Sequence, residues 1–96
     1  MRPSRNQLLI ESLAVEVKAR RLELGFTQED LAAQCNIDRP FISLIEVGRK
    51  QPSISVLYAL CVALQFSFAE FAERIELRYR KQQRVEARRA RQSATP

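Results

Sequence analysis

The chain has 96 residues, 46% of them hydrophobic, which is enough for one small domain with a single core. Only two glycines and four prolines interrupt it, so we expect an all-α fold. No apolar run approaches the roughly 20 residues that a membrane span needs, and Glu11 interrupts the N-terminus too early for a signal peptide. We therefore predict a cytoplasmic protein with no membrane partner.

The net charge of +5 is unevenly distributed. Residues 1–72 contain eight Lys/Arg and eight Asp/Glu, whereas residues 73–96 contain eight Lys/Arg and three Glu. A neutral part followed by a basic one indicates a polyanionic partner, although solubility alone also explains such a segment.

Several chemistries have no support in the residue types. There is no histidine, and the two cysteines, Cys35 and Cys61, both fall on apolar helical patterns that are typical of small, reduced core residues. Phosphate-cradling glycine loops and paired carboxylates are also missing from the sequence. We expect no metal, no cofactor and no enzymatic activity.

The N-terminal residues 1–6 are expected to form a flexible basic arm with Arg2 and Arg5. These two arginines either enter a DNA minor groove, follow the DNA backbone or remain solvated.

The first helix is expected over residues 7–24, with Gly25 ending it. Its apolar stripe recurs every four residues, at Leu9, Leu13 and Val17. Phe26 is expected to fill the core between the first two helices.

Two short helices should follow. Thr27 can cap a helix over Gln28–Cys35 by accepting a hydrogen bond from the amide of Asp30. Asp38 can cap another over residues 39–47, in which Pro40 is tolerated because the first turn does not need its N–H. Two short helices joined by such a turn form a helix-turn-helix, whose second helix can enter a DNA major groove.

A fourth helix is expected over residues 54–64, with Ser53 as its cap. Gln65 then stands where a terminating glycine is usual, which costs perhaps 1 kcal/mol if its backbone is left-handed.

Ser67 and Glu70 form a capping box that opens the fifth helix. One side of this helix carries an apolar stripe that either packs on its own domain or forms a dimer interface: Phe68, Phe71, Ala72, Ile75 and Tyr79. After Arg80 the apolar pattern fades into good helix-forming sequence with little to pack against. We therefore expect an extended basic C-terminal helix or tail over residues 81–96 that frays, is partly disordered and ends in disorder near residues 93–96. The arginines of this tail either add non-specific DNA affinity or remain solvated: Arg84, Arg88, Arg89 and Arg91.

Residues 10–72 resemble the lambda-repressor-like, XRE-type helix-turn-helix regulators of bacteria and phage. The similarity is carried by Arg21-x-x-x-Gly25-Phe26-Thr27-Gln28-x-x-Leu31-Ala32, then Ile42-Ser43-x-Ile45-Glu46-x-Gly48, Pro52-Ser53 and Leu57-x-x-Leu60-Cys61-x-Ala63-Leu64. Within the family, DRPFIS at residues 38–43 is most similar to the controller proteins of restriction–modification systems. The departures are Gln65 and Cys61, which replace a common Gly and Ala, and Pro40 and Phe41, which stand where polar base-reading residues often occur.

The resemblance implies five helices, a symmetric homodimer through the fifth helix, and binding to a palindromic operator in double-stranded DNA. Residues 7–80 would then form the DNA-binding and dimerisation domain.

The expected phosphate contacts come from three residues. Gln28 begins a helix whose free amides suit a phosphate, and in the family this position grips the DNA backbone. Arg49 and Lys50 follow the recognition helix and are placed to reach flanking phosphates.

Base reading is expected from Arg39, whose planar guanidinium matches guanine O6 and N7. Pro40 and Phe41 can touch a thymine methyl group, although Phe41 also fits as a cover for the helix junction. Ser43 offers one adaptable hydroxyl.

Arg21 and Glu46 are expected to have a structural role. Both lie on otherwise apolar faces, and the family pairs these positions, so we predict a partly buried ion pair rather than DNA contacts.

The function predicted from these features is a sequence-specific transcription regulator, with RNA polymerase as a further candidate partner. The alternative is an antitoxin-like module whose basic tail binds a partner protein.

Overall fold

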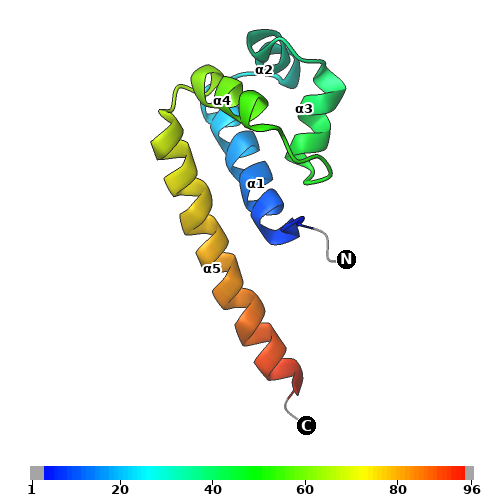
Figure 1. The fold of residues 1–96 in the computed structure, drawn as a ribbon, viewed down its shortest axis with the longest axis vertical. Coiled ribbons are helices and arrows are strands. Elements are labelled where there is room, and N and C mark those ends of the chain that lie inside the picture. The colour runs from blue at the N-terminus through cyan, green and yellow to red at the C-terminus, as the bar shows by residue number, and fades with distance from the viewer. Residues whose placement is uncertain (1–3, 95–96) are drawn as a thin grey trace.

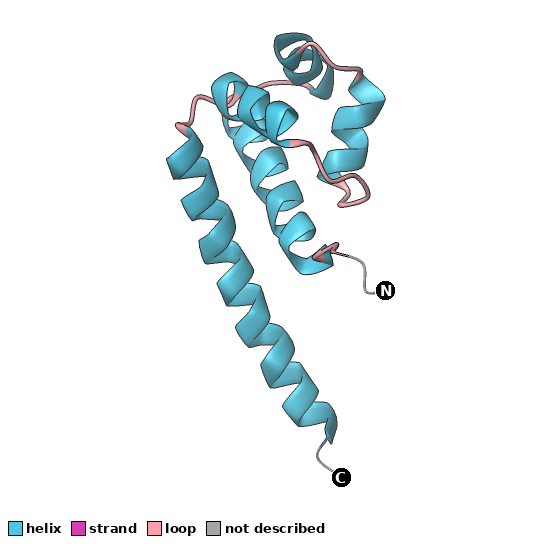
Figure 2. Ribbon diagram, in the orientation of Figure 1, coloured by secondary structure: helices cyan, strands magenta, loops and turns pink. Residues whose placement is uncertain are grey.

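The computed structural model describes residues 4–94, and all regular elements in this range are helices (Figures 1 and 2). The five helices are α1 (Gln7–Glu23), α2 (Gln28–Cys35), α3 (Arg39–Glu46), α4 (Ile54–Ala63) and α5 (Phe68–Ala94). The all-α fold with five helices is therefore confirmed. Arg2 lies outside the described residues, as do Thr95 and Pro96.

Most helices begin at a side-chain cap. The hydroxyl of Thr27 accepts from the Asp30 amide at 3.0 Å, and the Asp30 carboxylate accepts from the Thr27 amide at 2.9 Å. Ser67 and Glu70 form the same reciprocal pair at the start of α5. These hydrogen bonds lower the pKa of both carboxyl groups, because they favour the charged form.

Asp38 does not make the side-chain cap that we expected for α3. Its backbone carbonyl, not its carboxylate, accepts from the amide of Phe41 at 3.0 Å. A capping side chain normally accepts from the second or third amide of the helix. Pro40 has no amide hydrogen and the Phe41 amide already donates to the Asp38 carbonyl, so neither donor is available to the carboxylate.

The first four helices end in the same way. One residue with a positive φ follows each of them, and the next amide donates back to a carbonyl five residues earlier, as in Phe26 to Arg21 at 3.0 Å and Phe66 to Cys61 at 2.9 Å. The left-handed residues are Gly25, Asn36, Gly48 and Gln65. These short reversals bring consecutive helices into contact.

The core draws on all five helices, with α1 and α5 lying side by side and α2, α3 and α4 packed at one end of the pair (Figure 1). Its largest fully buried side chains are Phe71, Leu31, Ile42, Ile45, Leu60, Leu64, Val17 and Cys61. Burial raises the pKa of the Cys61 thiol to about 11, which suits a reduced core residue. Among the described residues, no group of His, Cys, Asp or Glu is arranged to hold a metal ion.

Two expectations about the core were wrong. Leu9 is 39% exposed and its neighbour Ile10 is buried instead, because the buried face of α1 is turned by one residue at its start. Phe26 is only half-buried and lies outside the core cluster; it lines an open hollow beside the turn after α1 instead.

The first half of α5 is fastened to α1. Arg78 donates to Glu16 at 2.8 Å, and Asn6 donates to the Tyr79 hydroxyl at 3.0 Å. At the start of α5, the guanidinium groups of Arg20 and Arg74 both lie over the ring of Phe66, 4.7 and 4.9 Å from its centroid.

The second half of α5 continues to Ala94 and projects beyond the start of α1 (Figure 1). An extended basic C-terminal helix was expected, because the segment after Arg80 is rich in Ala, Arg, Gln and Lys, which favour helix even without packing. Of residues 93–96, where disorder was expected, Ser93 and Ala94 are still helical, and Thr95 and Pro96 lie outside the described residues.

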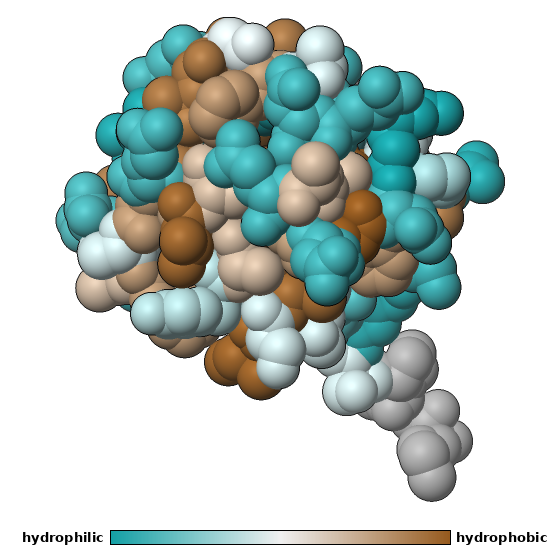
Figure 3. Space-filling model, turned by 90° about the horizontal axis from the view of Figure 1, so that it is seen from above, coloured by the Kyte–Doolittle hydropathy of each residue, from teal (hydrophilic) through white to brown (hydrophobic). Residues whose placement is uncertain are grey.

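Hydrophobic side chains also reach the surface, where Figure 3 shows them in separate patches among hydrophilic residues. No single helix within residues 4–94 is long and apolar enough to cross a membrane. Taken together, α4 and α5 have the length and composition of a membrane span, but the chain bends by 102° between them.

Candidate nucleic-acid interface

The helix-turn-helix consists of α2 and α3, joined through the left-handed Asn36. Ile42 and Ile45 anchor α3 in the core, both at most 1% exposed. This packing leaves Arg39 and Pro40 exposed at the start of α3. The second helix therefore presents its first turn to solvent, as a recognition helix must.

An ion pair between Arg21 of α1 and Glu46 of α3 lies beneath this surface. Arg21 Nε and Nη2 donate to the two carboxylate oxygens of Glu46 at 2.7 and 2.9 Å, and Nη1 donates to the Phe26 carbonyl at 2.8 Å. The side chains are only 9% and 2% exposed. The hydrogen bond that Arg21 donates to Glu46 raises the pKa of the Arg21 guanidinium, because it favours the charged form.

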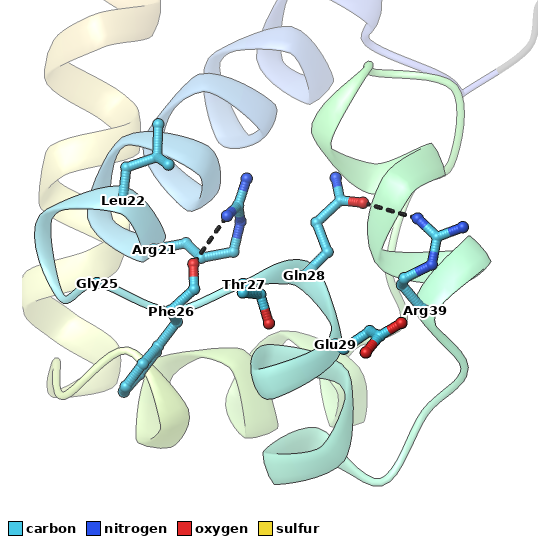
Figure 4. Close-up of a pocket in the computed structure, with 8 residues that line it drawn as sticks. All are labelled: Arg21, Leu22, Gly25, Phe26, Thr27, Gln28, Glu29 and Arg39. Atoms are coloured by element: carbon cyan, nitrogen blue, oxygen red, sulfur yellow. Dashed lines mark hydrogen bonds between the residues drawn. The ribbon is translucent and has the colours of Figure 1, made fainter.

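Gln28 extends this pair to the surface (Figure 4). Its Nε2 donates to Glu46 Oε1 at 3.1 Å, and its Oε1 accepts from Arg39 Nη1 at 3.1 Å. A continuous hydrogen-bonded chain thus runs from Arg21 through Glu46 and Gln28 to Arg39. Each side chain in it is oriented by the one below.

An open hollow of about 690 Å³ lies beside this chain. It is formed by the end of α1, the first turn of α2 and Arg39, with Phe26 and Glu29 at its edges (Figure 4). The positive end of α2 and the Arg39 guanidinium favour an anionic group here, such as a phosphate.

The loop after α3 is held by the N-terminal residues. Arg5 Nη2 donates to the carbonyl of Arg49 at 3.2 Å, and Gln7 Nε2 donates to that of Gly48 at 3.0 Å. A side chain at Gly48 would meet Glu11 Cγ at 3.2 Å, so this approach also requires glycine. Arg49 and Lys50 are exposed on the loop, while Arg5 braces its backbone.

The remaining predicted DNA-binding residues divide between the surface and the core. Phe41 is half-buried and packs against the core, which favours its role as a cover for the helix junction. Ser43 is half-buried. Val47, which we did not predict, is 63% exposed directly after the end of α3. Its apolar side chain gave no signal for DNA contact in the sequence.

The predicted dimer residues all line one apolar groove of about 540 Å³, together with residues of α1 and α4: Phe68, Phe71, Ala72, Ile75 and Tyr79. Phe71 also belongs to the core, since it is fully buried within the protomer and stacks on Phe66, with ring centroids 5.5 Å apart.

A second apolar surface was missed. Along the outer side of α4, Ile54, Tyr58 and Val62 are 70%, 56% and 62% exposed, and Tyr58 contacts Phe68 edge to face at 5.8 Å. Their i, i+4 and i+8 spacing indicates one continuous stripe, which could have been recognised because α4 contains no charged residue.

We expect Glu46→Gln to destabilise the fold by about 3–5 kcal/mol, because it leaves the Arg21 guanidinium buried without a counter-charge. Urea denaturation followed by circular dichroism measures this loss. The matched control is Glu76→Gln, which removes an exposed partner of Arg80 at 3.3 Å and should cost less than about 1 kcal/mol. Equal midpoints for the two variants would show that the buried pair does not support the fold.

Comparisons with known proteins agree with this geometry. A family model described as helix-turn-helix matches residues 17–71. The uncharacterized HTH-type transcriptional regulator YqaF of Bacillus subtilis is 39% identical over 57 residues, covering 59% of this chain and 75% of the relative. Another uncharacterized HTH-type regulator, y4dJ of Sinorhizobium fredii, is 38% identical over 50 residues, covering 52% and 65%.

Two solved structures are similar in fold. The restriction–modification controller protein C.Esp1396I, as a tetramer in complex with its natural 35 base-pair operator, has 34% identity and a TM-score of 0.71 over 77% of this chain and 97% of that one. The clp gene regulator ClgR from Corynebacterium glutamicum has 28% identity and a TM-score of 0.76 over 96% and 98%. From these matches and the helix-turn-helix described above, we conclude that the chain belongs to the XRE-type helix-turn-helix family of DNA-binding transcription regulators.

Proposed function

We propose that this protein regulates transcription in the cytoplasm by binding, as a homodimer, to a palindromic operator in double-stranded DNA. The observation that carries the proposal is the exposed first turn of α3, oriented by the hydrogen-bonded chain from Arg21 to Arg39. Preorganised side chains lose little conformational entropy on binding, which favours selective contacts with bases.

The DNA contacts follow from the positions of the side chains. Arg39 is assigned to a guanine in the major groove, with Pro40 beside it for a thymine methyl group. Gln28 and the amides of the first turn of α2 are assigned to a phosphate, since the hollow beside them opens to solvent. Arg49 and Lys50 would bind flanking phosphates.

The homodimer is proposed because one recognition helix reads too few base pairs for a unique operator. Two copies related by a two-fold axis would place their α3 helices about 34 Å apart, one turn of DNA. The stripe of Ile54, Tyr58 and Val62 is the proposed centre of the interface, continued by Phe68 and the adjoining groove. A helix that is apolar on every side normally has a partner on every side, but the outer side of α4 stays largely exposed apart from the contact of Tyr58 with Phe68.

Two narrower roles remain compatible with this proposal. The similarity to C.Esp1396I favours a controller of restriction–modification genes, with RNA polymerase as the partner through which it acts. The antitoxin-like alternative rests on the basic end of α5 and would require a co-purifying protein bound there.

Footprinting of the purified protein on the DNA upstream of its own gene, at two salt concentrations, tests the proposed function. We expect two protected half-sites with centres about 10 base pairs apart, and weaker binding at the higher salt concentration because phosphate contacts release counterions. A mutated half-site serves as the control and should abolish protection of both. If no discrete site is protected at either salt concentration, the protein-interaction alternative is favoured.

Arg39→Ala should weaken operator binding by about 1–3 kcal/mol and remove the preference for one base pair in each half-site. Lys50→Ala is the comparison: it should weaken binding to all sequences alike and reduce the salt slope by about one. Fluorescence anisotropy with operator and scrambled duplexes measures both. A loss for Arg39→Ala that is the same on both duplexes would assign Arg39 to a phosphate instead.

Tyr58→Glu should make the protein monomeric in sedimentation velocity, because it places a charge at the centre of the proposed apolar interface. Val15→Glu is the matched control, since Val15 is also an exposed hydrophobic residue, 46% accessible, but lies on α1 outside the stripe and the groove. Circular dichroism should show that both variants remain folded. A dimeric Tyr58→Glu variant would remove α4 from the interface.

A further inference from the structure

The positive charge of the molecule is concentrated in the projecting end of α5. Residues 80–94 contain six Lys/Arg and one Glu, a net charge of +5, which equals the charge of the whole chain. Residues 1–79 contain ten Lys/Arg and ten Asp/Glu, so the remainder is neutral. The part that carries the recognition helix therefore has no net charge of its own.

Most of these cations lie on one side of α5. With 100° of rotation per residue, five of the six fall within an arc of about 100°. These five residues, Arg80, Lys81, Arg84, Arg88 and Arg91, are all exposed and are called the cationic ridge below. Arg89 lies on the other side of the helix, so the ridge is a feature of the helical conformation rather than of composition alone.

The centre of the ridge faces away from α1. Arg78 and Tyr79 mark the side of α5 that contacts α1, through Glu16 and Asn6. On a helical wheel, the centre of the ridge lies well over 90° from this side, although Lys81 at its edge lines a small pocket with Glu16 and Arg78. Most of the ridge therefore lies on the projecting half of α5, away from the helix-turn-helix (Figure 1).

The chemistry of the ridge favours phosphates over a protein surface. Protein interfaces bury an apolar centre, whereas the ridge presents five cations with no large hydrophobic side chain among them. Arg80 and Arg91 are separated by about 16 Å along the helix, a length suited to several successive phosphates.

Building on the proposed function, we propose that the cationic ridge is a second DNA-binding element, which binds the phosphate backbone outside the half-site without reading sequence. It supplies much of the salt-dependent affinity that the neutral part of the molecule does not. Operator choice remains with α3.

The test compares the Arg84→Gln/Arg88→Gln variant with the parent by fluorescence anisotropy at several salt concentrations. Two duplexes are used: the operator alone, and the operator extended by about one helical turn on each side. The parent should bind the extended duplex more tightly and with a steeper salt dependence. In the variant, the slope of log K against log salt on the extended duplex should fall by about two units, close to 0.9 for each lost phosphate contact.

The matched control is Arg89→Gln, compared with Arg88→Gln, since the two variants remove the same charge from adjacent positions of one helix, and Arg89 lies about 100° around the helix from Arg88, off the ridge. Only Arg88→Gln should change the slope. Equal slopes for both, or no gain for the parent from the added flanks, would overturn the ridge proposal. A smaller slope accompanied by loss of the dimer in sedimentation would also overturn it, by assigning the ridge to a protein contact.

The failure of this proposal can be distinguished from the failure of the proposed function. Without an operator footprint for the parent, the function itself is wrong. With a normal footprint and unchanged slopes in the ridge variant, only the role of the ridge is wrong.

Discussion

The ion pair between Arg21 and Glu46 is the interaction on which the arrangement of this molecule depends. Apolar contacts hold α1 and α3 together but tolerate small rotations, whereas two parallel hydrogen bonds at 2.7 and 2.9 Å fix distance and orientation together. A third bond, to the Phe26 carbonyl, joins the α1–α2 turn to the same guanidinium. Because burial of two charges is costly, the pair is better understood as a determinant of geometry than as a source of stability.

The consequence is a recognition helix that is positioned from both ends. A helix of eight residues has little stability of its own, so its orientation must come from its contacts. At its start, Gln28 links Arg39 to Glu46. At its end, Gln7 and Arg5 hold the backbone of the following loop. The surface that meets DNA is therefore built by residues that do not all touch DNA.

The sequence predicts local features of this fold well and tertiary ones poorly. The ends of the first four helices were predicted within one residue, since caps such as Thr27 and left-handed positions such as Gly48 depend on immediate neighbours. The Arg21–Glu46 pair could be expected because charged residues stood on apolar faces. Phe71 and Phe68 lie three residues apart on one stripe, and only the packing of Phe66 decides which one enters the core. The contact of Arg5 with the loop joins residues 44 positions apart, a separation that no local pattern reveals.

Two surfaces of the protomer remain largely exposed to solvent, and their chemistry differs. The outer stripe of α4 consists of Ile54, Tyr58 and Val62, and such a surface is stabilised by apolar contacts that DNA phosphates cannot offer. The cationic ridge of α5 has the opposite requirement, since its charges gain little from an apolar partner and much from a polyanion. One partner cannot satisfy both surfaces. A second copy of the chain on α4 together with DNA phosphates along α5 satisfies each, and both contacts would then form in a single assembly on the operator.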